Sequence, residues 1–123
     1  ERNIGEMEGL TVEEVRQKPQ PQYVTPYNSI GGNGEGDWEL YLRAGKALHG
    51  LLRRPAGSYL VVSHGGMLNQ LMHAIVGIVH QPDPSGVRFH FENTSFARVT
   101  YFPHRHRWAI DAVNDRAHLK SLK

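Results

Sequence analysis

The fold of this chain is decided by the stretch Leu60-Val61-Val62-Ser63-His64-Gly65-Gly66-Met67-Leu68. Its apolar, β-branched run predicts a strand over 58–63, and near-continuous apolarity is typical of a strand buried on both faces. The two glycines then open an amphipathic helix over 66–78. Ligands bind outside the carboxyl ends of strands in α/β folds, and the first N–H groups of a helix have no intrahelical partner. We therefore expect a phosphate pocket at His64, Gly65 and Gly66, the alternative being a simple turn that the histidine caps.

The composition is that of an ordinary globular domain. The chain has 123 residues, enough for one domain at most, and 39% of them are hydrophobic. No apolar run approaches the roughly 18 residues of a membrane span, and the polar start does not resemble a signal peptide. The absence of cysteine excludes disulfides and thiolate catalysis and fits a cytoplasmic protein. With a net charge of only +2, we expect neither nucleic acid nor a membrane as a partner.

The flanking segments predict the remaining elements. A capping box at Thr11 and Glu14 starts a short helix that must end near Pro19. Proline and glycine make 19–36 an irregular loop, after which Asp37 is expected to cap a helix reaching about Arg53. Beyond the helix over 66–78, period-two alternation predicts three strands, over 87–91, 96–101 and 108–113. This order of elements indicates an α/β fold with a mixed sheet.

Four stretches together resemble the histidine phosphatase superfamily, also called the phosphoglycerate mutase-like family. In chain order they are Glu1-Arg2-Asn3-Ile4-Gly5-Glu6-Met7-Glu8-Gly9-Leu10-Thr11, Gly34-Glu35-Gly36-Asp37 with Arg43, Val62-Ser63-His64-Gly65-Gly66, and Asn93-Thr94-Ser95 with Asn114-Asp115-Arg116-Ala117-His118-Leu119. The resemblance implies a three-layer α/β/α fold with a mostly parallel mixed sheet. It also implies a reaction through a phosphohistidine, which splits one difficult displacement into two easier ones.

The resemblance assigns two catalytic roles. Glu1 matches the family's proton donor, the alternative being a solvated chain end. His64 matches the second histidine of the phosphate pocket, and the N–H groups of Gly65 and Gly66 could contact phosphate oxygens. Glu35 is expected to face the substrate entrance. Asn93 lies where a strand approaches the pocket, although ordinary turn chemistry explains this residue as well.

The family's nucleophile is absent from this sequence. No Arg-His-Gly motif is present, and Arg105-His106-Arg107 lies late in the chain with no glycine after it. We therefore interpret residues 1–123 as the C-terminal part of one histidine phosphatase domain, incomplete at its N-terminal side. The missing half, or a second copy of the chain, is expected to cover the open sheet edge.

The predicted function is hydrolysis of a small phosphate monoester, with no cofactor and no metal. A phosphoglycerate mutase is an alternative, but the interval between Gly9 and Gly34 is short for the substrate-capping insertions of mutases. A non-catalytic fragment that binds phosphate compounds or a protein through its sheet edge is another alternative. A zinc-dependent hydrolase remains a weaker one, since His104 and His106 would share one side of a strand without a clear third ligand.

Overall fold

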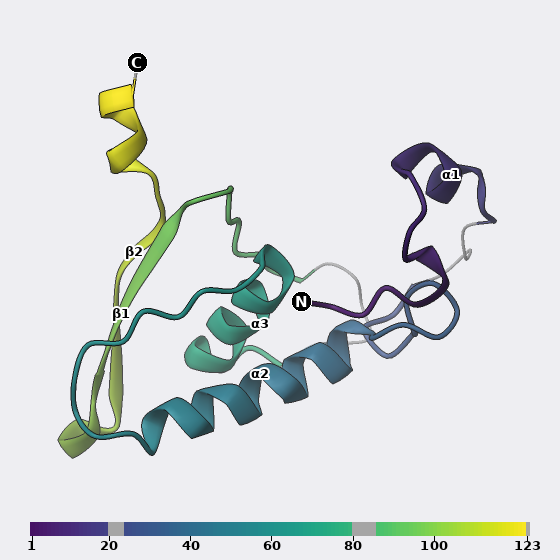
Figure 1. The fold of residues 1–123 in the computed structure, drawn as a ribbon. Helices are drawn as coiled ribbons and strands as arrows, with labels where there is room; N and C mark the ends of the chain where they lie inside the picture. Colours follow the sequence, from purple (N-terminus) through teal and green to yellow (C-terminus); the bar gives the residue numbers. More distant parts are fainter. Residues whose placement is uncertain (20–23, 80–85, 123) are drawn as a thin grey trace. The chain divides into compact units, whose positions relative to one another are not determined.

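The structure, a computed structural model, describes residues 1–19, 24–79 and 86–122. These residues form two compact units, Glu1–Val87 and Arg88–Lys123, and each unit is treated by itself. The described part of the first unit is helical, and that of the second unit contains an antiparallel hairpin (Figure 1). The predicted loop over 19–36 is irregular in its described part, apart from residues 20–23, which lie outside the described residues.

The first helical segments are short and local. A 3-10 turn, η1 (Gly5–Met7), precedes helix α1 (Val12–Gln17). The predicted capping box is confirmed: the Glu14 amide donates to the Thr11 hydroxyl over 3.3 Å, and the Thr11 amide donates to the Glu14 carboxylate over 2.7 Å. This carboxylate is fully exposed, and the hydrogen bonds from Thr11 lower the pKa of Glu14. Because α1 buries no residue, we expect this cap to contribute most of its local stability.

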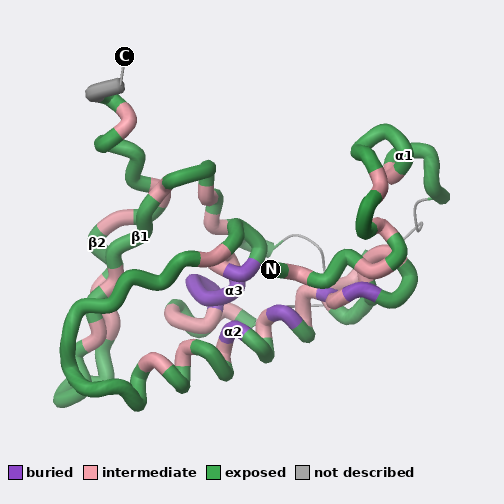
Figure 2. The backbone as a smooth tube through the Cα atoms, in the orientation of Figure 1, coloured by how far each residue is buried: buried purple, intermediate pink, exposed green. Residues whose placement is uncertain are grey.

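The core of the first unit lies between helices α2 (Asp37–Leu52) and α3 (Gly65–Val76), which pack against each other. Figure 2 shows buried positions along their facing sides. The buried apolar side chains of this contact are Leu40, Ala44, Met67 and Leu71. Leu48 and Leu68 are partly buried and pack against them. Both helices were predicted from their apolar spacing, and both predictions are confirmed. Helix α3 ends at Gly77, whose φ of 74° is the left-handed conformation that glycine adopts freely.

The helix caps differ in detail from the sequence prediction. Gly36, rather than Asp37, is the N-cap of α2, and Asp37 is the first helical residue. The prediction that Asp37 caps the helix is therefore wrong. The Gly36 amide donates to the Glu39 carboxylate over 3.1 Å, so Glu39 supplies the side-chain half of this cap.

The predicted central strand over 58–63 is not part of any described sheet. Its apolar side chains are exposed instead, with 77% of Leu60 and 85% of Val62 accessible to solvent. Tyr59 makes local contacts: its hydroxyl donates to the Pro55 carbonyl over 2.6 Å, and the Arg54 guanidinium lies over its ring. A strand exists only through its ladder partners, and the described residues provide none for this segment. The segment 87–91 likewise lies outside the described sheet, so both strand predictions are wrong for this structure.

The second unit is an antiparallel hairpin. Strand β1 (Phe96–Phe102) pairs with β2 (Arg107–Asp115) in a register that places Tyr101 opposite Trp108. The turn η2 (Pro103–Arg105) and the left-handed His106 connect the strands, and η3 (Ala117–Leu122) follows β2. Two of the predicted strands are thus confirmed. The described sheet is two-stranded and antiparallel rather than mostly parallel, because 58–63 and 87–91 do not join it.

No described helix is both long enough and apolar enough to span a membrane.

Candidate functional site

His64 occupies the N-cap of α3, which begins at Gly65, one residue before the predicted start at Gly66. Its backbone is extended, with φ −110° and ψ 154°, and its carbonyl accepts the Leu68 amide over 2.9 Å. The His64 side chain makes no capping hydrogen bond, and no acidic residue lies in the first turn of α3. The amides of Gly65 and Gly66 therefore begin a 12-residue helix whose positive end is not neutralised from within its first turn.

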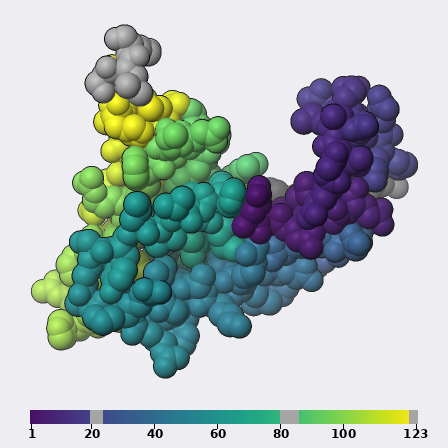
Figure 3. Space-filling model, viewed as in Figure 1, coloured from purple at the N-terminus to yellow at the C-terminus, as the bar shows by residue number. Residues whose placement is uncertain are grey.

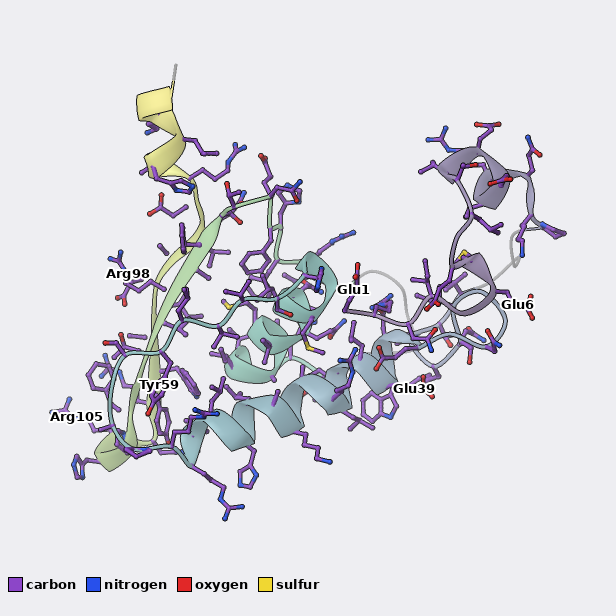
Figure 4. All side chains as sticks on the ribbon, viewed as in Figure 1. Glu1, Glu6, Glu39, Tyr59, Arg98 and Arg105 are labelled. Carbon is purple, nitrogen blue, oxygen red and sulfur yellow. The ribbon has the colours of Figure 1, made fainter. Side chains whose placement is uncertain are left out.

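Glu1 and His64 lie together although 62 residues separate them in the chain. The Oε1 atom of Glu1 is 3.6 Å from Nδ1 of His64, and this contact is an ion pair when the imidazole is protonated. Figure 4 shows Glu1 beside the start of α3. Both side chains are open to solvent, 72% exposed for Glu1 and 57% for His64. An exposed pair of this kind stabilises the fold little, so its arrangement is of more interest for binding than for stability.

Backbone contacts place the N-terminal segment against the loop that leads into α2. The Glu35 amide donates to the Asn3 carbonyl over 2.7 Å, and the Glu6 amide donates to the Gly31 carbonyl over 3.0 Å. The N-terminal segment and the loop cross at Gly34, and they lie so close together there that only glycine fits. A β-carbon on Gly34 would lie 2.8 Å from both the Asn3 carbonyl oxygen and the Gly5 nitrogen. The glycines of the second resembling stretch therefore have a packing role here.

Two arginine–carboxylate pairs add to this anchoring. Arg2 forms an ion pair with Asp37. Arg43, from α2, donates from Nε and Nη2 to the two carboxylate oxygens of Glu35 over 2.8 and 2.7 Å. The same Nη2 donates to the Glu1 carbonyl over 2.7 Å. The Arg43 hydrogen bonds hold the pKa of Glu35 below its usual value, against the opposing effect of burial, and they raise the pKa of Arg43.

A polar depression of about 460 Å³ adjoins Glu1 on the side of α2. Its lining is formed by Glu1, Asn3, Ser29, Asn33, Gly34, Glu35, Glu39 and Arg43. His64 is not part of this lining, so Glu1 contributes both to the depression and to the contact with His64. Figure 3 shows the first residues of the chain, in dark purple, uncovered on the face drawn. Glu35 belongs to the lining of this depression, and Arg43 donates a hydrogen bond to each of its carboxylate oxygens.

Asn93 belongs to the second unit, where it lies in an exposed turn. The Ser95 amide donates to the Glu92 carbonyl over 3.1 Å across this turn, and Thr94 has a left-handed φ of 64°. A left-handed threonine is uncommon, and the flanking contacts of Glu92 with Asn114 and Arg116 fix the turn. Asn93 is thus placed by turn geometry within its own unit.

No cluster suited to a metal ion occurs within 1–19, 24–79 and 86–122: nowhere there do three or more histidine or carboxylate side chains converge. His106 is instead next to the Tyr101 hydroxyl, 2.9 Å from its Nδ1, at the hairpin turn.

Sequence reasoning missed the arginines of this site. Arg2 and Arg43 both lie in stretches that carry the family resemblance, but the sequence predicts no role for either. The Arg43–Glu35 pair spans the start of α2 and links a helix to a loop, so helical i,i+4 spacing could not reveal it.

The comparisons with known proteins identify the class. A family model of the histidine phosphatase superfamily (branch 1) matches residues 1–116, so the chain belongs to this superfamily. Membership supports phosphoryl-transfer chemistry of the phosphatase or mutase type and an α/β fold of the phosphoglycerate mutase kind. No curated protein and no solved structure gave a significant match.

Proposed function

We propose that this chain supplies half of a phosphomonoesterase site that works through a phosphohistidine. Glu1 is the general acid and base, and His64 is the second histidine of the phosphate pocket. The observation that carries the proposal is the 3.6 Å distance between the Glu1 carboxylate and the His64 imidazole at the start of α3, where the His64 side chain makes no capping hydrogen bond. Family membership supplies the reaction class.

The proposed pocket stabilises negative charge with groups already in place. The amides of Gly65 and Gly66 and the dipole of α3 favour an anion at this end of the helix. A protonated His64 adds a positive charge and a hydrogen-bond donor. Fixed donors of this kind stabilise a transferring phosphoryl group without reorganising during the reaction.

The proposed reaction has two balanced steps. A histidine nitrogen, supplied by a segment that precedes this chain, forms a bond to phosphorus while the bond to the leaving oxygen breaks. Glu1 gives its proton to that oxygen. Water then attacks the phosphohistidine, the phosphorus–nitrogen bond breaks, and the Glu1 carboxylate takes the proton from water. Glu1 lies close enough to His64 to serve a group bound there.

The same proposal accounts for the exposed apolar segment 59–62. A strand from the N-terminal half of the domain would pair with this segment, bury Leu60 and Val62, and complete the three-layer fold. In that complete domain we propose that Glu35 faces the substrate entrance and that Asn93 lies near the pocket.

Binding of orthovanadate, an analogue of the transferring phosphoryl group, tests the proposed pocket in this chain. We expect a saturable shift of the Gly65 and Gly66 amide signals and of the His64 ring signals in NMR spectra. His64→Ala should remove it, whereas His49→Ala, an exposed histidine on α2, should leave it intact. Shifts that never saturate, or that survive His64→Ala, would contradict the proposal.

A phosphatase assay separates the two histidine roles. The chain alone should not hydrolyse p-nitrophenyl phosphate, because its nucleophile lies elsewhere. Hydrolysis by the chain alone that disappears in His64→Ala would make His64 the nucleophile and overturn the assignment.

A further inference from the structure

We propose that Arg43 is a positioning residue for Glu1, and that Glu35 acts through Arg43 by fixing the direction of its guanidinium. This inference rests on the proposed function, in which Glu1 is the acid. It adds the contacts that fix the position of Glu1. Neither Arg43 nor Glu35 needs to contact the reacting atoms for this role.

The Nη2 atom of Arg43 connects Glu35 to Glu1 through its two protons. Nη2 of Arg43 donates one hydrogen bond of 2.7 Å to Glu35 and another of 2.7 Å to the Glu1 carbonyl. Nε donates to the second Glu35 oxygen over 2.8 Å, so the guanidinium is held as a fork and cannot rotate freely. The remaining Nη2 proton is thereby directed at Glu1.

The two partners of this pair differ in exposure, and 45% of the Arg43 side chain is accessible to solvent. The Glu35 side chain is only 15% exposed, and its own amide is bound to the Asn3 carbonyl. Arg43 is anchored in α2, whose neighbouring turn places Leu40 and Ala44 in the core. The Glu1 backbone is thus attached, through Arg43, to a helix that contributes to the core of the first unit.

The other arginine of the segment has a different role. Arg2 pairs through its own side chain with Asp37 and so fixes residue 2. Arg43 instead binds the main chain of residue 1, directly beside the acid.

The test uses the His64 ring signals in NMR spectra as a report on the place of Glu1. In the chain as given, Glu1→Ala should shift these signals because the carboxylate next to Nδ1 is lost. Arg43→Gln should reproduce most of that shift, and the double variant should add nothing further, since coupled residues are not additive. Arg43→Lys, which has no fork, should give an intermediate shift. Arg16→Gln, from an exposed pair with Glu13, is the matched control and should leave His64 unchanged.

The outcomes distinguish the two proposals. Movement of the His64 signals in Glu1→Ala but not in Arg43→Gln overturns the positioning role and leaves the proposed function intact. Unmoved signals in Glu1→Ala remove the Glu1–His64 relationship, and both proposals fail. Should Arg43→Gln lose its helical circular dichroism, Glu35→Gln decides instead: it must shift His64 in the same direction, and a wild-type spectrum would overturn the inference.

Discussion

The Nε2 atom of His73 lies 2.7 Å from the carbonyl oxygen of Val87. This contact connects α3 to the C-terminal residue of the first unit. The His73 ring is buried, and its Nδ1 is 3.3 Å from Oε1 of the equally buried Gln70. A buried polar ring is tolerated when both of its nitrogens have partners. His73 is therefore a structural histidine, in contrast to the exposed His64.

Replacing His73 by phenylalanine should lower the free energy of unfolding by about 1 kcal/mol, because the ring volume is largely kept while the hydrogen bond from Nε2 to the Val87 carbonyl is lost. Urea denaturation would measure the effect. His49→Phe, at an exposed position of α2, is the control and should change stability by less than about 0.5 kcal/mol. Equal effects of the two substitutions would show that the His73 contacts contribute nothing.

Gly34→Ala should destabilise the first unit by about 1–3 kcal/mol, since the added methyl group collides with backbone atoms of both Asn3 and Gly5. Gly45→Ala meets nothing within 4 Å and lies inside α2, where alanine favours the helix by roughly 0.5–1 kcal/mol. Thermal unfolding of the two variants should therefore move in opposite directions. A shift of the same sign would contradict the close crossing at Gly34.

Leu40→Ala should cost about 2–5 kcal/mol, because Leu40 is 0% exposed between α2 and α3. Leu60→Ser should change the unfolding free energy by less than about 0.5 kcal/mol, since Leu60 is mostly exposed. A large loss in Leu60→Ser, measured by urea unfolding of the same chain, would indicate that the 58–63 segment is buried in solution.

Acid should weaken the anchoring of the N-terminal segment through Glu35. Its pKa is lowered in the folded state from the usual 4.5, so its stabilising effect is present above that value and is lost as the pH falls through the folded pKa. Urea midpoints recorded between pH 7 and pH 3 should therefore converge for the native chain and Glu35→Gln as the pH decreases. A gap that stays constant over this range would exclude a stabilising Glu35 carboxylate.

The helices could be predicted from the sequence because their signals are local. The capping box of Thr11 and Glu14 and the apolar spacing of α2 and α3 depend only on near neighbours. The alternation of apolar and polar residues likewise predicted strands β1 and β2 of the hairpin. The prediction of a strand over 58–63 was wrong because apolarity describes what a strand would bury, whereas a strand also needs a ladder partner, and the described residues provide none for this segment.

The site was predictable in part for the same reason. The glycines after His64 correctly indicated a helix start beside the imidazole. The binding of Arg43 to the Glu1 carbonyl joins positions 42 residues apart, and no periodicity records such a contact. The contact depends on the packing of loop 30–36 against residues 3–6, which is a tertiary feature.

Because the N-terminal segment is held at Gly34, the number of residues between Glu1 and Asn3 affects where the Glu1 carboxylate lies. The N-terminal segment is fixed at residue 3 and again at residue 6, so a residue inserted between Glu1 and Asn3 would displace the carboxylate by up to about 3.6 Å. That is as large as the gap now separating Glu1 from His64. The number of residues between Glu1 and the contact at Gly34 therefore contributes, together with the Arg43 hydrogen bond, to the distance between Glu1 and His64.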